Sequence, residues 1–290
     1  MRLATIEHRT GTSAALVTDD GVAPVRALPG RDDAADVTAL ISSPLTSAEV
    51  TALAGHRLPA REVTWLPPVL HPPKNVICVG KNYREHVEEG ARAEGLAEAV
   101  IPEAPVYFTK PHTALTGHGA TVVADPAFTR ALDYEGELAL VIGTRARGLT
   151  AAGALDCVFG YTIFNDLTAR DVQQRHLQWF RGKGADGYGP IGPWIVTADE
   201  IPDPRALRVR TLVNGEVRQD DTVKNLIFDL TTLLTDLTQG LTLEPGDIIA
   251  TGTPQGVAWG MDDPAWLRPG DGVTVEIDGI GRLDTTIGLP

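Results

Sequence analysis

The chain has 290 residues, of which 43% are hydrophobic and 22% are charged, and its formal net charge is -13 at pH 7. These values are typical of a globular protein with one large or two modest domains. The excess of acidic residues argues against nucleic acid or an anionic membrane as a partner. No apolar run is long enough to span a bilayer, and the first residues lack an apolar signal core, so we expect a cytoplasmic protein.

Residues 1–70 are predicted to form a small N-terminal α/β domain. Strands over residues 3–8 and 14–17 are expected to form a hairpin, and helices are expected over 36–40 and 46–54. Two proline pairs, at 67–68 and 72–73, then mark a boundary, because proline interrupts regular structure. A larger domain over residues 71–290 is predicted to follow.

The larger domain contains many short β-branched or aromatic segments separated by Gly and Pro, which is typical of strands. Strands are expected over 75–79, 106–109, 121–123, 138–142, 158–164, 194–197, 208–213, 247–251, 272–277 and 282–286. Helices are fewer, with two notable ones expected over 167–178 and 226–239. This ratio favours an α+β, strand-dominated roll or barrel over a doubly wound sheet. Cys78 and Cys157 lie in apolar runs and are expected to be buried and unpaired.

Residues 84–104 are polar and interrupted by glycines between two predicted strands. A segment of this kind can act as a lid that orders over a bound ligand. A plain exposed helix and loop would have the same composition. Both interpretations are open at the level of sequence.

Glu135 and Glu137 occupy alternate positions directly before the apolar run 138–142. In a strand over 134–142 the two carboxylates would project from the same face, where burial is costly unless a cation lies between them. With no Cys or His beside them, the oxygen ligands favour Mg²⁺, Mn²⁺ or Ca²⁺ over zinc. Two solvated glutamates at a strand end are the alternative.

Asp166 follows the predicted strand 158–164 and precedes a helical pattern. This position would let its carboxylate lean into a cleft beside the two glutamates. Helix capping is an equally good explanation of an aspartate at such a junction.

Six short motifs of the chain occur in the same order as in a known protein family. They are Gly80-Lys81-Asn82-Tyr83-Arg84-Glu85-His86, Tyr107-Phe108-Thr109-Lys110-Pro111, Asp133-Tyr134-Glu135-Gly136-Glu137-Leu138, Asn165-Asp166-Leu167-Thr168-Ala169-Arg170-Asp171-Val172-Gln173, Arg181-Gly182-Lys183 and Thr251-Gly252-Thr253-Pro254-Gln255-Gly256-Val257. In order and spacing they resemble the fumarylacetoacetate hydrolase family over residues 75–290. The segment 184–194 is similar to a bacterial branch with 2-hydroxyhepta-2,4-diene-1,7-dioate isomerases and diketo-acid or acylpyruvate hydrolases.

The resemblance implies a mixed β-sandwich roll that binds one divalent ion, usually Mg²⁺ or Mn²⁺ with Ca²⁺ as a further option, through Glu135, Glu137 and Asp166. Substrates of the family are 2-oxo acids, often 3-acylpyruvates or oxaloacetate. Their 1-carboxylate and 2-oxo oxygens chelate the metal, so that C3 behaves as a stabilised carbanion. The resemblance also implies a homodimer.

Further roles are implied by the same resemblance. His86 matches the general base, and Glu89, three residues later, would orient its ring. Lys183 matches a lysine beside the bound oxo acid and is expected to stabilise the enolate. Residues expected to contact the substrate are Arg170, Gln173, Tyr188, Gly252 and Thr253, with the turn 251–256 offering backbone amides to a carboxylate.

The sequence therefore predicts a metal-dependent enzyme that cleaves a C–C bond of a 2,4-dioxo acid of the acylpyruvate type, releasing pyruvate and a carboxylic acid. Isomerisation or decarboxylation of a related 2-oxo or 2-hydroxy dienoic diacid, or of oxaloacetate, by the same enolate chemistry is the first alternative. A catalytically idle protein that binds metal and oxo acid is the second.

Overall fold

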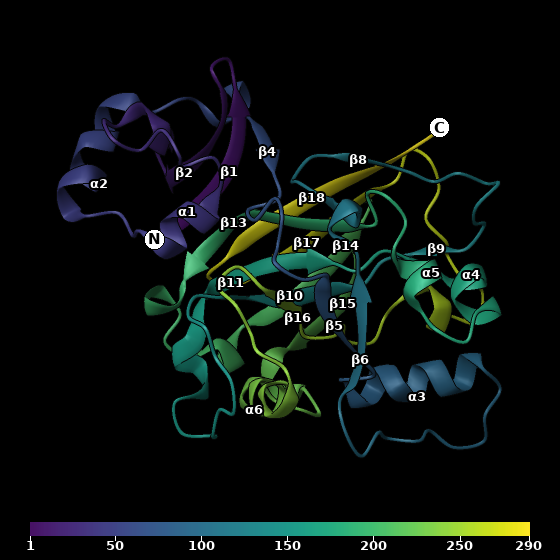
Figure 1. Ribbon diagram of the computed structural model, residues 1–290. Coiled ribbons are helices and arrows are strands. Elements are labelled where there is room, and N and C mark those ends of the chain that lie inside the picture. Colours follow the sequence, from purple (N-terminus) through teal and green to yellow (C-terminus); the bar gives the residue numbers. More distant parts are fainter.

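The computed structural model describes all 290 residues and consists mainly of two large sheets (Figure 1). The first has 11 strands, which are β1 (Arg2–His8), β2 (Gly11–Thr18), β3 (Gly21–Pro24), β4 (Thr64–Leu66), β5 (Val76–Gly80), β6 (Val106–Lys110), β7 (Leu115–Thr116), β10 (Gly136–Ile142), β11 (Val158–Asn165), β13 (Gly189–Thr197) and β16 (Ile248–Ala250). Its order is β3-β2-β1-β13-β11-β10-β16-β5-β6, with β4 beside β1 and β7 beside β13.

The second sheet has five strands, which are β8 (Thr121–Val123), β14 (Arg208–Val213), β15 (Glu216–Thr222), β17 (Gly272–Ile277) and β18 (Gly281–Gly288). Its order is β15-β14-β17-β18-β8. Two short strands, β9 (Leu132–Asp133) and β12 (Thr168–Ala169), pair separately. The α-helices are α1 (Val37–Ser42), α2 (Ser47–Leu53), α3 (Arg84–Ala93), α4 (Arg170–Arg175), α5 (Phe180–Lys183) and α6 (Leu230–Gly240).

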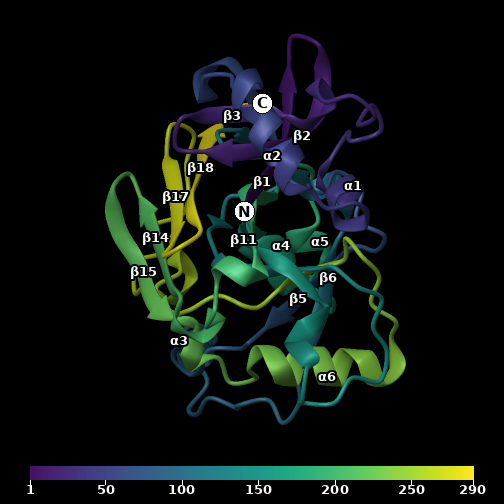
Figure 2. The same cartoon turned by 90° about the vertical axis from the view of Figure 1, so that its left-hand side faces the viewer.

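Strand β10 lies at the centre of the packing and is buried along its whole length. Leu138 and Leu140 face a core shared with β14, β17 and α6, whereas Ala139 and Val141 face a second core shared with β1, β2 and α1. A sheet covered on both faces requires a continuous apolar run, which explains why residues 138–142 contain no polar side chain. In Figure 2 the second sheet stands beside β11 and β5, and α6 lies below. This is the α+β, strand-dominated sandwich roll that was predicted.

The N-terminal hairpin and the two short helices were predicted correctly. Strand β1 pairs with β2 and also with β13, where Leu3 lies opposite Ile195, so the N-terminal strands extend the first sheet. The purple elements form a lobe at the upper left of Figure 1. A domain boundary near residue 70 stays a prediction.

Several expected boundaries were wrong. The helix expected over 167–178 is limited to α4, because Thr168 and Ala169 pair with β9. The helix expected over 226–239 begins at Leu230, where Asp229 accepts a hydrogen bond from Thr232 N at 2.8 Å.

Three strands also differ from the expected pattern. Strand β10 begins at Gly136, so Glu135 precedes it. Strand β13 begins at Gly189 and not at residue 194 as expected, and β15 was missed because its side chains are mostly polar. None of the helices has the length and hydropathy that a membrane span requires.

Candidate active site

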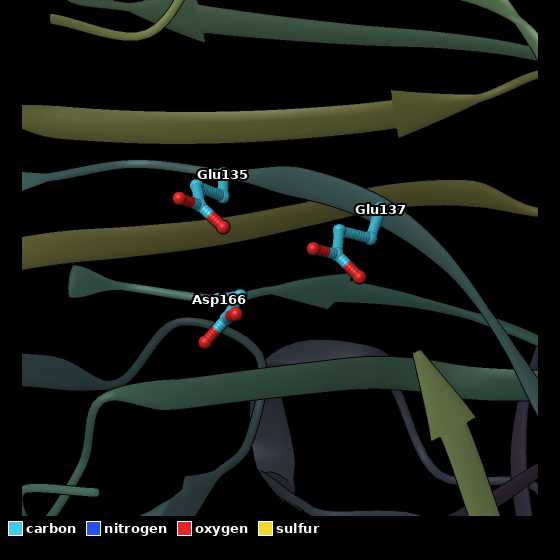
Figure 3. Close-up of side chains that lie close together, drawn as sticks. All are labelled: Glu135, Glu137 and Asp166. Carbon is cyan, nitrogen blue, oxygen red and sulfur yellow. The ribbon is translucent and has the colours of Figure 1, made fainter. Parts of the chain in front are cut away.

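Three carboxylates converge beside the start of β10 and the end of β11 (Figure 3). Glu135 precedes β10, Glu137 is its second residue, and Asp166 follows β11. All three are buried, and one oxygen from each lies within 4.8 Å of the others. Asp166 N donates to Glu135 O at 2.8 Å, and Glu135 N donates to Asn165 Oδ1 at 3.1 Å, so strand pairing fixes the arrangement.

Two buried lysines contact this triad. Lys183 Nζ lies 2.8 Å from Glu135 Oε2, 2.7 Å from Asp166 Oδ2 and 2.8 Å from Thr168 Oγ1, which uses all three of its N–H donors. Lys110 Nζ lies 2.7 Å from Asp166 Oδ1 and also donates to the backbone oxygens of Leu167 and Lys183. The sequence predicted a site role for Lys183 only, although Lys110 stands in one of the quoted motifs.

Arg170 is the third buried cation of the site. Its Nη2 lies 2.7 Å from Glu135 Oε1, and its Nε donates to Asp133 Oδ2 at 2.9 Å. Gln173 Oε1 accepts from Arg170 Nη1 at 3.2 Å, and the guanidinium carbon lies 5.2 Å from the centre of the Trp259 ring. Asp133, which sequence reasoning missed, therefore orients an arginine that contacts the triad.

Glu137 differs from the other two carboxylates because no cation pairs with it. Its carboxylate accepts a hydrogen bond from Gly252 N at 2.8 Å, and its side chain is 1% exposed. Burial, and then the negative charges of Asp166 and Glu135, raise the pKa of Glu137 well above its usual range. Burial acts in the same direction on Glu135, but Lys183 and Arg170 outweigh it and lower the pKa of Glu135 to about 2.

The charges of the site favour an added cation. The site contains four buried carboxylates and three buried cations, which leaves an excess of negative charge away from water. The carboxylates are those of Asp133, Glu135, Glu137 and Asp166, and the cations are Lys110, Arg170 and Lys183. A divalent ion would reverse that excess and give Glu137 a partner. Oxygen-only donors suit a hard ion such as Mg²⁺ or Mn²⁺, so the residues present fit the predicted metal.

His86 and Glu89 form the pair that their spacing predicted. On α3, His86 Nδ1 lies 3.3 Å from Glu89 Oε2, and Glu89 Oε1 accepts from Gly256 N at 3.0 Å. A Cβ at Gly260 would lie 1.9 Å from Glu89 Cγ, so this glycine is what allows the carboxylate to be buried there. The imidazole is thus held by a carboxylate that is itself held by the backbone.

The turn 251–256 uses its amides within the protein. Gly252 N donates to Glu137 and Gly256 N donates to Glu89, so the amides expected for a substrate carboxylate bind two protein carboxylates instead. Gly252 has a φ of 99°, and a Cβ there would lie 2.9 Å from Val79 O. Thr253 donates to Gly136 O at 3.0 Å.

A cavity of about 500 Å³ opens beside the triad. Of the predicted site residues, its wall includes Glu135, Glu137, His86, Lys183, Arg170, Gln173 and Thr253. Phe108, Trp179, Trp259, His176 and Lys81 also line it, and sequence reasoning assigned none of them. Tyr188 is not part of this wall, since it is buried in a hydrophobic cluster with its ring 6.0 Å from that of Phe128.

Gln219 on β15 connects the second sheet to the site. Its Oε1 accepts from Gly136 N at 3.0 Å, and its Nε2 donates to Thr253 Oγ1 at 2.8 Å and to Pro254 O at 2.7 Å. Nothing in the sequence pointed to this residue, because β15 itself was not predicted.

Comparisons with known proteins find a matching family model and similar proteins. The family model "Fumarylacetoacetate (FAA) hydrolase C-terminal" matches residues 75–288. Oxaloacetate tautomerase YisK of Bacillus subtilis (strain 168) is 49% identical over 222 residues, which are 76% of this chain and 72% of that protein.

Two solved structures cover the whole chain. Fumarylacetoacetate hydrolase from the psychrophilic Exiguobacterium antarcticum has a TM-score of 0.85 and 38% identity, with 100% of both chains covered. The 5-carboxymethyl-2-hydroxymuconate delta-isomerase from Mycobacterium smegmatis has a TM-score of 0.77 and 35% identity, with 100% of this chain and 99% of that chain covered. The similar proteins thus include a tautomerase, a hydrolase and an isomerase.

Proposed function

The chain belongs to the fumarylacetoacetate hydrolase family, and we propose that it is a divalent-metal-dependent enzyme that moves a proton at C3 of a short 2-oxo diacid, interconverting the keto and enol forms of an oxaloacetate-type substrate. The observation that carries the proposal is the buried triad of Glu135, Glu137 and Asp166 beside a cavity whose wall holds His86. The similarity to an oxaloacetate tautomerase supports the choice of reaction.

The proposed metal is Mg²⁺ or Mn²⁺, held by the triad. When bound, it would supply Lewis-acid polarisation of the carboxylate and 2-oxo oxygens of the substrate, which acidifies C3. The homodimer implied by the family resemblance and the cytoplasmic location expected from the sequence are part of the same proposal.

His86 is the proposed proton carrier. Because its Nδ1 lies against Glu89, Nε2 is the ring nitrogen left for the substrate. Glu89 would stabilise the protonated ring, so that His86 takes the C3 proton and returns it to the enol oxygen or to C3. The rings of Phe108, Trp179 and Trp259 in the cavity wall would exclude water from this exchange.

Lys183 would hold the triad together. Its three N–H donors are all used by Glu135, Asp166 and Thr168, so it orients two of the proposed ligands. A direct contact between Lys183 and a substrate enolate needs one of these donors to be released, and that contact stays a prediction.

C–C bond hydrolysis of a 2,4-dioxo acid is the second candidate. The cavity of about 500 Å³ falls within the range of pockets for drug-sized ligands, which leaves room for an acyl group beyond the chelating end of an acylpyruvate. The His86–Glu89 pair is also suited to activate a water molecule for attack on that acyl group.

The two candidates are separated by one pair of assays. We expect the protein with Mg²⁺ or Mn²⁺ to accelerate the decay of the enol absorbance of oxaloacetate, and excess chelator to abolish the acceleration. Acetylpyruvate serves as the hydrolysis substrate, with release of pyruvate as the readout. Cleavage of acetylpyruvate without any effect on oxaloacetate would establish the hydrolase, and inactivity on both would refute the proposed function.

A further inference from the structure

Lys81 combines an unusual backbone with a position in the cavity wall. It directly follows β5, and its φ is 56°, one of two positive values among the non-glycine residues of the chain. The other is Asn214, in the turn between β14 and β15, where such a conformation is common. Lysine rarely adopts the left-handed region, and residues held there cluster at functional sites.

Neighbouring contacts impose this conformation. Asn82 is 0% exposed, and its side chain donates to Thr251 O at 2.8 Å and accepts from Phe228 N at 2.8 Å. On the other side, a Cβ at Gly80 would lie 2.3 Å from the ring of Trp179. The chain on both sides of Lys81 is therefore fixed by contacts in which the Lys81 side chain takes no part.

Lys81 is also the unpaired cation of the cavity. Of the lysines and arginines in its wall, Lys183 and Arg170 are bound to the buried carboxylates. The Lys81 side chain makes no hydrogen bond or ion pair, although Glu94 lines the same cavity. Lys81 is exposed and also lines a second, smaller cavity whose wall includes His86, the proposed base.

We propose that Lys81 binds the second carboxylate of a 2-oxo diacid and thereby selects diacids over monoacids. The inference deepens the proposed function and rests on it. With its first carboxylate and oxo group at the triad, a diacid would carry its second charge into a cavity that already holds Glu135, Glu137 and Glu94. A free ammonium is the group that can neutralise that charge, whereas a monoacid gains nothing from it.

The test compares oxaloacetate with 2-oxobutanoate, which has a methyl group in place of the second carboxylate. Exchange of the C3 protons in D₂O, followed by NMR with Mg²⁺ present, reports on the same step for both compounds. We expect Lys81→Met to raise KM for oxaloacetate about tenfold, the effect of losing one hydrogen bond to a charged group, and to leave kcat nearly unchanged. The kinetics of 2-oxobutanoate should not change, and Lys81→Arg should restore most of the affinity.

Two further variants make the comparison specific. Lys224→Met removes an exposed lysine outside the cavity and should have no effect. Arg92 lines an adjoining cavity of about 490 Å³ that shares Arg170 and Trp259 with the first. If Arg92→Met, and not Lys81→Met, raises KM for the diacid, the second carboxylate binds there and the proposal is overturned.

The remaining outcomes are equally decisive. Equal losses on both compounds in Lys81→Met would mean that the residue only maintains the fold of the β5–α3 turn, and no loss on either would remove it from recognition. Calorimetry of oxaloacetate binding to the Mg²⁺-loaded wild type and to Lys81→Met tests the role of Lys81 separately from the proposed function. If binding weakens in the variant while the wild type exchanges no C3 protons, Lys81 binds the second carboxylate but the proposed function is refuted. If the wild type does not bind oxaloacetate, both proposals are refuted.

Discussion

Gln219 offers the sharpest test of how the second sheet supports the proposed metal centre. Its side chain is 1% exposed and makes three hydrogen bonds, to Gly136 N, Thr253 Oγ1 and Pro254 O, at 2.7–3.0 Å. Gly136 stands between the two glutamates of the triad. Gln219→Leu keeps a side chain of similar size but leaves the amide of Gly136 and the carbonyl of Pro254 buried without partners.

The expected loss of stability follows from the three hydrogen bonds that the substitution removes. At about 1 kcal/mol for each buried hydrogen bond, Gln219→Leu should lower the free energy of unfolding by about 3 kcal/mol. For a chain of this size that corresponds to a decrease in Tm of roughly 5 °C. Metal affinity should also fall by about tenfold or more, because residues that orient metal ligands contribute on that scale.

Thermal unfolding by circular dichroism and calorimetric titration with Mn²⁺ measure the two effects. Gln239→Leu is the matched control, since Gln239 is exposed on α6 and its hydrogen bonds to Leu149 O and Thr235 O are long, at 3.4 and 3.3 Å. We expect that variant to change stability by less than about 0.5 kcal/mol. A Tm for Gln219→Leu equal to that of the control would refute the stability argument, and a lower Tm with unchanged Mn²⁺ affinity would refute the link to the metal site.

Other predictions concern the triad, the base, the lysine and the α3 region. Glu137→Gln should weaken Mn²⁺ binding at least about tenfold, because it removes the one triad charge without a cationic partner, and an unchanged titration would disprove its role as a ligand. His86→Ala should keep its metal yet lose about 100-fold or more in kcat, so full turnover would exclude it as the base. Lys183→Met should lower kcat by about 100-fold and slow metal-dependent C3 exchange of pyruvate, whereas a raised KM with intact kcat would make it a carboxylate anchor. Hydrogen exchange over residues 84–104 should slow when metal and oxalate are both bound, and equal rates with and without oxalate would rule out a lid.

The local sequence determined much of the core of the site. The alternation of Glu135 and Glu137 before an apolar run encodes two carboxylates at the start of a buried strand, and both properties depend only on neighbouring residues. The spacing of His86 and Glu89 likewise encodes a contact within one helical turn, which the 3.3 Å separation confirms. The junction after the predicted strand 158–164 pointed to Asp166, and the family motifs added Lys183.

Tertiary structure alone decided which groups satisfy those side chains. The partners of Glu135, Glu137 and Gly136 are Lys183, Gly252 and Gln219, which lie 48, 115 and 83 residues away along the chain. Periodicity and composition carry no information about such distant pairs, because they arise only when β16 pairs with β10 and when α5 and the second sheet pack near the site. For the same reason the sequence led to the prediction that the amides of the turn 251–256 bind a substrate carboxylate. In the folded protein two of these amides donate to Glu137 and Glu89. Burying those carboxylates away from water is what makes these hydrogen bonds necessary.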